Sequence, residues 1–124
     1  KKAVILGLAF KANIDDARES LSLKAKKALE REGARVIIHD PHIKEYNLDL
    51  NKILKNADLV FIATAHKWYF KNLTPKKLQK LVKKNCIICD IWNILKTNKI
   101  IFTANGLLNN KKIKQTAASK KKKS

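Results

Sequence analysis

The sequence predicts an α/β domain of Rossmann-like, three-layer architecture with a mainly parallel sheet of about five strands. Short apolar runs rich in β-branched residues alternate along the chain with segments whose apolar residues recur at helical spacing. Gly33, Pro41 and Pro75 stand at the boundaries between these segments. Repeated strand–helix–strand alternation implies right-handed crossovers and a parallel sheet with helices on both faces.

The first half of the chain predicts two strands separated by one helix. Residues 3–7 (AVILG) form a continuous apolar run, which is typical of a strand buried on both faces. A helical pattern follows, with Ser20 as a suitable N-cap and Gly33 as a suitable stop. The next strand, within ARVIIHDP, is expected to end at Asp40 and Pro41.

The second half continues the alternation. It predicts a short helix at 49–56, a strand at 57–64, a helix at 75–84, a strand at 85–91 and a short strand at 99–106. Thr74 and Pro75 supply a cap and a first-position proline for the second of these helices. We therefore expect one domain over residues 1–110 and a basic, disordered tail over 111–124.

The composition fits a globular domain and limits the partners. The formal net charge is +18, and the tail at 111–124 contributes seven lysines and no acid, which leaves +11 for 1–110. Only three of the 28 basic residues are arginine, the residue that specific phosphate and base recognition favours, so nucleic acid is not the expected partner. No apolar run approaches ~20 residues, and we expect a cytoplasmic protein with no signal peptide and no membrane span.

The two cysteines, Cys86 and Cys89, form a C-x-x-C within NCIICDI. Their spacing along a strand directs the side chains to opposite faces, and the three histidines do not supply a second tight pair of ligands. We expect two free, mostly buried thiols and no metal site.

Ligands of open parallel sheets bind beyond the carboxyl ends of the strands. This rule selects the loops 7–20, 40–44, 64–72 and 90–96. The first loop is too long and too poor in glycine for the G-x-G-x-x-G dinucleotide fingerprint, so a self-contained dinucleotide site is not expected.

Several side chains in these loops are candidate ligand contacts, each with a structural alternative. Lys11 and Arg18 could meet phosphates or a carboxylate, or Arg18 could pair with the neighbouring aspartates to order the loop. His66 could act as a general base or be structural, and no cysteine, serine or carboxylate is obviously arranged to work with it. Asp40 could bind a ribose or only turn the chain.

The aromatic run Trp68, Tyr69 and Phe70 could stack on a base or belong to the core or an interface. These residues alone do not form a convergent catalytic set.

Four motifs in register nonetheless resemble one known family. GLAFKANIDDARES, HDP at 39–41, ADLVFIATAHKWYF and CDIWNIL are similar in order and spacing to the C-terminal, UDP-binding domain of the UDP-glucose/GDP-mannose dehydrogenase family. His66 and the DDARES form look most like the UDP-N-acetyl-D-mannosamine dehydrogenases of that family.

The resemblance implies an NAD-dependent oxidation of the C6 alcohol of a UDP-sugar to a carboxylate, with UDP-N-acetylmannosamine as the expected substrate. It also implies partner domains of the same enzyme, an N-terminal NAD domain and a central dimerising region, and a homo-oligomer at full length. The family's catalytic cysteine lies in those domains, so neither cysteine of this chain is that nucleophile. We expect this chain to have no dehydrogenase activity by itself.

Carried over by position, Phe10 and Lys11 match the pair that contacts the nucleotide sugar, and Arg18 matches the arginine that reaches the cofactor. One position departs from the family, which commonly reads Asp-Gly-Arg-Asn where this chain has Trp92 in place of the arginine. An indole cannot supply a charge-assisted bond. Lys96 could compensate, the sugar could bind differently, or the substrate could have changed.

Three alternatives remain open beside this interpretation. The domain could belong to a UDP-glucose 6-dehydrogenase, the basic surface could make it a nucleic-acid-binding module, or it could be a structural remnant with no ligand.

Overall fold

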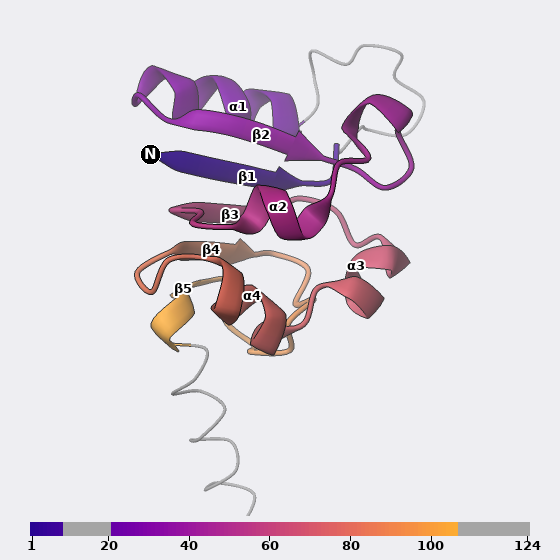
Figure 1. The fold of residues 1–124 in the computed structure, drawn as a ribbon, viewed down its shortest axis with the longest axis vertical. Helices are drawn as coiled ribbons and strands as arrows, with labels where there is room; N and C mark the ends of the chain where they lie inside the picture. The colour runs from indigo at the N-terminus through magenta and orange to yellow at the C-terminus, as the bar shows by residue number, and fades with distance from the viewer. Residues whose placement is uncertain (9–20, 107–124) are drawn as a thin grey trace, which may run out of the picture.

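The computed structural model describes residues 1–8 and 21–106, which form one five-stranded sheet (Figure 1). The strands are β1 (Lys2–Leu6), β2 (Arg35–His39), β3 (Leu59–Ile62), β4 (Ile87–Asp90) and β5 (Ile101–Thr103), and their order is β2-β1-β3-β4-β5. The first four are parallel and β5 runs antiparallel to β4. The predicted fold class, a mainly parallel sheet of about five strands, is confirmed.

Helices cover both faces of the sheet. The helical elements are α1 (Leu21–Arg31), the 3-10 turn η2 (Lys44–Tyr46), α2 (Leu50–Leu54), α3 (Lys67–Asn72) and α4 (Pro75–Leu81). Successive residues of a strand point to opposite faces, so β1 contributes to two cores. Val4 packs in the larger core with residues of α2 and α4, and Ile5 packs in the smaller one with Leu29 of α1.

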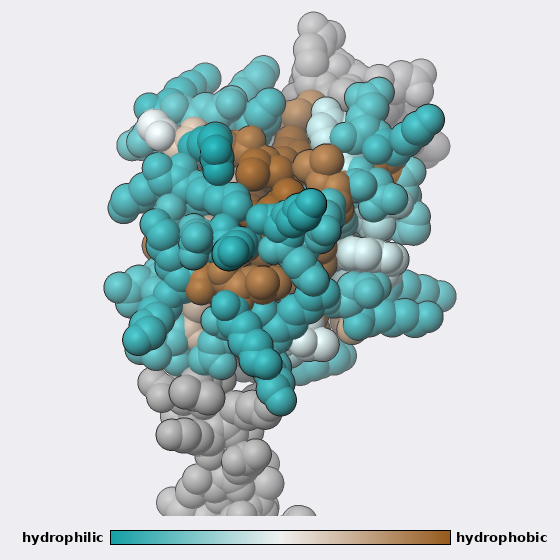
Figure 2. Space-filling model, in the orientation of Figure 1, coloured by the Kyte–Doolittle hydropathy of each residue, from teal (hydrophilic) through white to brown (hydrophobic). Residues whose placement is uncertain are grey.

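The face toward α2 and α4 is largely hydrophilic on the outside. Figure 2 shows charged and polar side chains over most of this face, with a hydrophobic band across its middle. On the α1 side, the outward-facing residues Ile87 and Ile101 of β4 and β5 are exposed. Among the residues that the structure describes, no helix has the length and apolar character needed to cross a membrane.

Local sequence signals explain most helix ends. Asp49 caps α2 by accepting hydrogen bonds from the Asn51 and Lys52 amides. Thr74 caps α4 through the Lys77 amide, with Pro75 at the first position as predicted. Gly33 adopts a φ of +89° just beyond the end of α1, which is the stop that the sequence indicated.

Helix α3 was not predicted, because residues 64–72 were interpreted as a loop. Its N-cap residue, His66, makes no side-chain capping bond, and its sequence KWYFKN is rich in aromatic residues, which have modest helix propensity. Tyr69 is completely buried in the larger core. Tertiary burial of this ring, and not local propensity, therefore accounts for the helix.

Gly7 ends β1 in a conformation that requires glycine. Its φ is +95°, and a Cβ built at this position would lie 2.0 Å from Thr64 Oγ1. The β1 turn is therefore packed directly against the residue that follows β3, with no room for a side chain.

We predict that Gly7→Ala lowers the free energy of unfolding by about 3 kcal/mol or more, because it adds a steric clash to left-handed strain. Gly33→Ala is the matched control, since its φ is also positive and a Cβ added there would meet no atom within 4 Å. That control should cost about 1 kcal/mol, from strain alone. Urea unfolding measures both, and equal losses would contradict the packing explanation.

Candidate functional site

The topology places one switch point at the carboxyl edge of the sheet, between β1 and β3. From β1 the chain crosses through α1 to β2 on one side, and it then returns through α2 to β3 on the other side. Backbone bonds fix this edge, with the Ala63 amide donating to the Leu6 carbonyl at 2.9 Å. Open α/β sheets bind ligands in the crevice at such a point.

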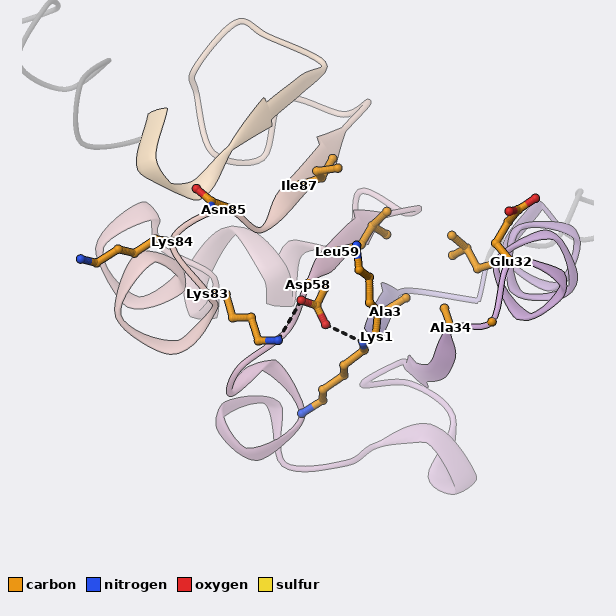
Figure 3. Close-up of a pocket in the computed structure, with 13 residues that line it drawn as sticks. Lys1, Ala3, Glu32, Ala34, Asp58, Leu59, Lys83, Lys84, Asn85 and Ile87 are labelled. Carbon is orange, nitrogen blue, oxygen red and sulfur yellow. Dashed lines mark hydrogen bonds and ion pairs between the residues drawn. The ribbon is translucent and has the colours of Figure 1, made fainter.

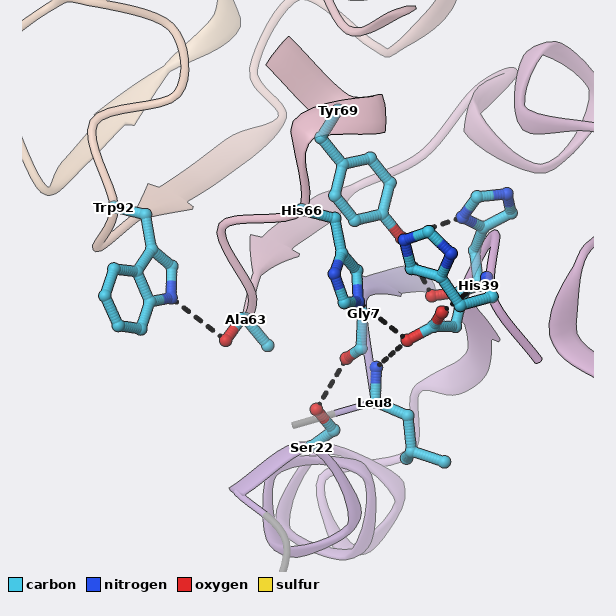
Figure 4. Close-up of polar contacts among 10 residues, drawn as sticks. Gly7, Leu8, Ser22, His39, Ala63, His66, Tyr69 and Trp92 are labelled. Atoms are coloured by element: carbon cyan, nitrogen blue, oxygen red, sulfur yellow. Dashed lines mark hydrogen bonds and ion pairs between the residues drawn. The ribbon is translucent and has the colours of Figure 1, made fainter. Parts of the chain in front are cut away.

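The predicted site residues Phe10, Lys11 and Arg18 lie outside the described residues. The structure does describe the residues that flank their segment. The Leu8 amide donates to Asp40 Oδ2 at 2.9 Å, and Ser22 Oγ donates to the Gly7 carbonyl at 2.6 Å (Figure 4). The described residues near this segment, Leu8 and Ser22, are therefore both hydrogen-bonded at the switch point.

Asp40 is the central polar group of this edge and is only 2% exposed. Besides the Leu8 amide, its carboxylate accepts the His42 amide at 2.8 Å and lies 3.1 Å from His66 Nε2. Burial alone would raise the pKa of Asp40, but the bonds from Leu8, His42 and His66 outweigh it and hold the pKa below 3.8. The sequence left two roles open for Asp40, a contact to a ribose and a turn of the chain. These hydrogen bonds show that Asp40 stabilises the turn after β2.

The pairing of His66 with Asp40 corrects the expectation that no carboxylate is arranged to work with this histidine. The two residues are 26 positions apart, but they follow β3 and β2 and so meet at the same edge. The His66 side chain is 28% exposed, and its ring packs edge-on against His42 with 4.6 Å between centroids. Its oriented, partly exposed imidazole can offer a hydrogen bond to a ligand.

His39 and Tyr69 form a second, fully buried polar pair. The Tyr69 hydroxyl donates to the His39 carbonyl at 3.0 Å and lies 2.8 Å from His39 Nδ1 (Figure 4). Burial lowers the pKa of His39, although the neighbouring Asp40 acts in the opposite direction, and burial raises the pKa of Tyr69. Both side chains are part of the core that supports the edge.

The aromatic run of α3 thus divides between core and surface. Tyr69 is buried, the Trp68 ring packs 5.3 Å from the His39 ring, and Phe70 is 43% exposed. Lys96 places its ammonium 5.4 Å from the Phe70 ring centroid. The lysine considered as a substitute for the missing arginine therefore lies on an aromatic ring beside the edge.

The loop after β4 is built on a second buried carboxylate. Asp90 is 1% exposed and accepts the Ile94 and Leu95 amides, each at 2.9 Å. Within this loop Trp92 donates its indole N–H to the Ala63 carbonyl at 3.0 Å (Figure 4). The residue in place of the expected arginine thus fastens the β4 loop to the end of β3.

The cysteines take no part in this edge. Both are free, Cys86 is buried and Cys89 is partly buried, as predicted. Burial, with a smaller contribution from Asp58, raises the pKa of Cys86 to about 12, so its reactive thiolate is scarce at neutral pH. Within residues 1–8 and 21–106 no three metal-binding side chains cluster.

A hollow of about 670 Å³ lies at the opposite, amino edge of the strands (Figure 3). It is organised by Asp58, which accepts the Lys2 amide at 2.7 Å and the Lys83 ammonium at 2.9 Å. These bonds, the amide first, lower the pKa of Asp58. This ion pair connects β1, β3 and the segment after α4, so we assign it a structural role.

The turn after β1 differs at Gly7 from the glycine-rich turn of a dinucleotide site. A glycine-rich turn binds pyrophosphate because its backbone leaves open space for the phosphates. Here the space beside Gly7 is filled by the Thr64 side chain. The fold, with buried polar side chains at its carboxyl edge, defines a domain of the Rossmann-like class.

The chain belongs to the UDP-glucose/GDP-mannose dehydrogenase family, and residues 4–97 match the UDP binding domain of that family. The chain is similar to the UDP-N-acetyl-D-mannosamine dehydrogenases of Methanococcus vannielii (31% identity, covering 78% of this chain and 24% of the relative) and Pyrococcus horikoshii (32%, covering 83% and 24%). It thus spans about a quarter of the length of these relatives.

Solved structures agree with this assignment. An NDP-N-acetyl-D-galactosaminuronic acid dehydrogenase from Methanosarcina mazei is similar with a TM-score of 0.64 and 29% identity, over 78% of this chain and 22% of that one. A UDP-N-acetyl-mannosamine dehydrogenase from S. aureus is similar with a TM-score of 0.58 and 32% identity, over 77% and 23%.

We predict that Asp40→Asn lowers the free energy of unfolding by about 2–3 kcal/mol. Both carboxylate oxygens of Asp40 accept N–H groups, so the NH₂ group of asparagine would face an N–H donor in a buried site. Asp49→Asn is the control, since Asp49 is an exposed N-cap and asparagine caps equally well. Chemical denaturation compares the two variants. A loss for Asp40→Asn no larger than for the control would contradict the role of the carboxylate.

We also predict that the free energy of unfolding falls as the pH is lowered from 6.5 toward 5.5. Because burial lowers the pKa of His39 below 6.5, the unfolded state binds a proton that the folded state resists. The slope contributed by one such group is at most about 1.4 kcal/mol per pH unit. Urea unfolding at several pH values should give a shallower slope for His39→Phe than for wild type, and an equal slope would contradict this role of His39.

Proposed function

We propose that this chain is the nucleotide-sugar-binding domain of an NAD-dependent UDP-sugar 6-dehydrogenase, which oxidises a C6 alcohol to a carboxylate. The observation that carries the proposal is the match of residues 4–97 to a UDP binding domain, on a parallel sheet whose strand order reverses between β1 and β3. A domain of this kind binds a nucleotide sugar with side chains around the switch point and leaves the dinucleotide to another part of the enzyme.

Within this proposal, Phe10 and Lys11 contact the nucleotide sugar and Arg18 reaches toward the cofactor. Their segment is anchored on both sides at the switch point, by the Leu8–Asp40 and Ser22–Gly7 bonds. A lysine ammonium and an arginine fork are suited to the charge of a diphosphate. NAD and the catalytic cysteine belong to domains outside this chain, and the full enzyme is a homo-oligomer.

The substrate we favour is UDP-N-acetylmannosamine, oxidised to its uronic acid. Support comes from the relatives, several of which carry that activity in their names. The alternative is UDP-glucose, since a putative UDP-glucose 6-dehydrogenase of Bacillus subtilis is 31% identical over 87% of this chain. Competition between the two nucleotide sugars for the full-length enzyme distinguishes them.

We predict that UDP binds the 124-residue chain and that NAD does not, as measured by isothermal titration calorimetry. Lys11→Ala should weaken UDP binding about tenfold, the order of one charge-assisted contact. Lys80→Ala is the control, because it removes the same charge from the exposed surface of α4, toward the amino edge of the sheet.

Tight NAD binding without UDP binding would overturn the proposal. Strong, steeply salt-dependent binding of duplex DNA, abolished by deleting residues 111–124, would instead support a nucleic-acid-binding module.

A further inference from the structure

Trp92 combines a large solvent exposure with a hydrogen bond that fixes its side chain. Its side chain is 52% exposed, although its N–H is hydrogen-bonded to the Ala63 carbonyl at 3.0 Å. Tryptophan usually buries its large apolar ring and needs a partner for its single N–H. Here the N–H is satisfied by the protein, so the part of the indole that meets water is its apolar ring.

The loop that carries Trp92 is preorganised. Asp90 accepts two amides from the loop, at Ile94 and Leu95. Two hydrogen bonds connect Asn93 and Asn98. Asn93 Nδ2 donates to Asn98 Oδ1 at 3.0 Å, and the Asn98 backbone amide donates to Asn93 Oδ1 at 3.0 Å. Both asparagines have positive φ values, which non-glycine residues adopt rarely. The ring is therefore presented in a fixed place and not on a loose loop.

That place is next to the switch point. Ala63, which accepts the indole N–H, directly follows β3, and its amide is bonded to the last residue of β1. Ala63 also lies between Trp92 and His66 in Figure 4. Trp92 thus lies on the β4 side of the switch point, and the polar cluster around Asp40 lies on the β2 side.

We propose that the exposed ring of Trp92 is a stacking surface for the pyrimidine base of the nucleotide sugar. The inference rests on the proposed function, because a bound UDP moiety brings one flat, unsaturated ring to this edge. The diphosphate is neither flat nor apolar, so an indole without a spare N–H has little to offer it. Base–aromatic stacking needs only two π faces and no further hydrogen-bond donor.

Among the residues that the structure describes, the other tyrosine, tryptophan and phenylalanine rings of this edge already have packing partners, and Tyr46, after β2, packs against the smaller core. Trp68 packs on His39, and Tyr69 is buried with its hydroxyl bonded to the His39 carbonyl. Phe70 faces the ammonium of Lys96 at 5.4 Å. Trp92 is therefore the ring that the described edge offers to a base.

Tryptophan fluorescence tests the contact directly, because the chain has only two tryptophans. In the variant Trp68→Phe, Trp92 is the sole emitter. UDP at saturation should quench its emission, whereas 5,6-dihydro-UDP, whose base is no longer flat and aromatic, and inorganic pyrophosphate should not. Calorimetry on the same samples records whether each compound is bound.

Binding affinity provides the second test. Trp92→Ala should weaken UDP binding by roughly tenfold, the order expected for loss of one base–aromatic stack, and should leave the affinity for pyrophosphate unchanged. Trp92→Phe, which keeps a π face, should stay within about threefold of wild type. Ile101→Ala is the control, since Ile101 is a 67% exposed apolar residue on β5.

The outcomes separate this inference from the proposed function. If UDP binds but Trp92 emission is unchanged, or if Trp92→Ala binds UDP as wild type does, the stacking surface is wrong and the UDP-binding domain stands. If wild type binds no UDP, both are wrong. Quenching by UDP alone, with loss of affinity in Trp92→Ala and not in Ile101→Ala, establishes the contact.

Discussion

The buried carboxylate of Asp40 is the interaction on which the geometry of the carboxyl edge depends. A buried charge is costly unless hydrogen bonds replace its lost hydration. Asp40 receives the amides of Leu8 and His42 and pairs with His66, so groups that follow β1, β2 and β3 converge on one side chain. Hydrogen bonds to an ionised group are stronger than those between neutral groups. The end of β1 therefore cannot shift relative to β2 and β3 without breaking hydrogen bonds to the buried Asp40 carboxylate.

Asp90 is the buried carboxylate that fixes the loop after β4 at the same edge. It fixes the β4 loop through two amides, and Trp92 connects that loop to Ala63. The switch point between β1 and β3 is thus flanked by two hydrogen-bonded segments, each centred on a buried aspartate that ends or follows a strand. Segments fixed in this way hold ligand groups in place more accurately than a mobile loop can.

The sequence predicted the parts of this structure that depend on local patterns. Hydrophobic periodicity located all five strands and three of the four α-helices that the structure describes, and Thr74, Pro75 and Gly33 marked helix ends correctly. It missed α3, which exists because Tyr69 is buried. It also missed the pairing of His66 with Asp40, because side chains 26 residues apart come together only through the strand order. The rule that ligands bind at strand ends selected the loops 40–44 and 64–72. It does not say which side chains of two such loops contact each other.

The strong positive charge and the built edge have different physical roles. A net charge of +11 over residues 1–110 attracts anions, but such attraction extends only about a Debye length, ~8 Å at physiological salt, and does not distinguish one anion from another. Discrimination has to come from short-range contacts whose geometry is fixed before the ligand arrives. Among the described residues, the hydrogen bonds of Asp40 and Asp90 fix the carboxyl edge in this way, whereas an internal ion pair organises the hollow at the amino edge. Charge can therefore accelerate the encounter with an anion, but selectivity requires positioned contacts such as those that Asp40 and Asp90 organise at the carboxyl edge.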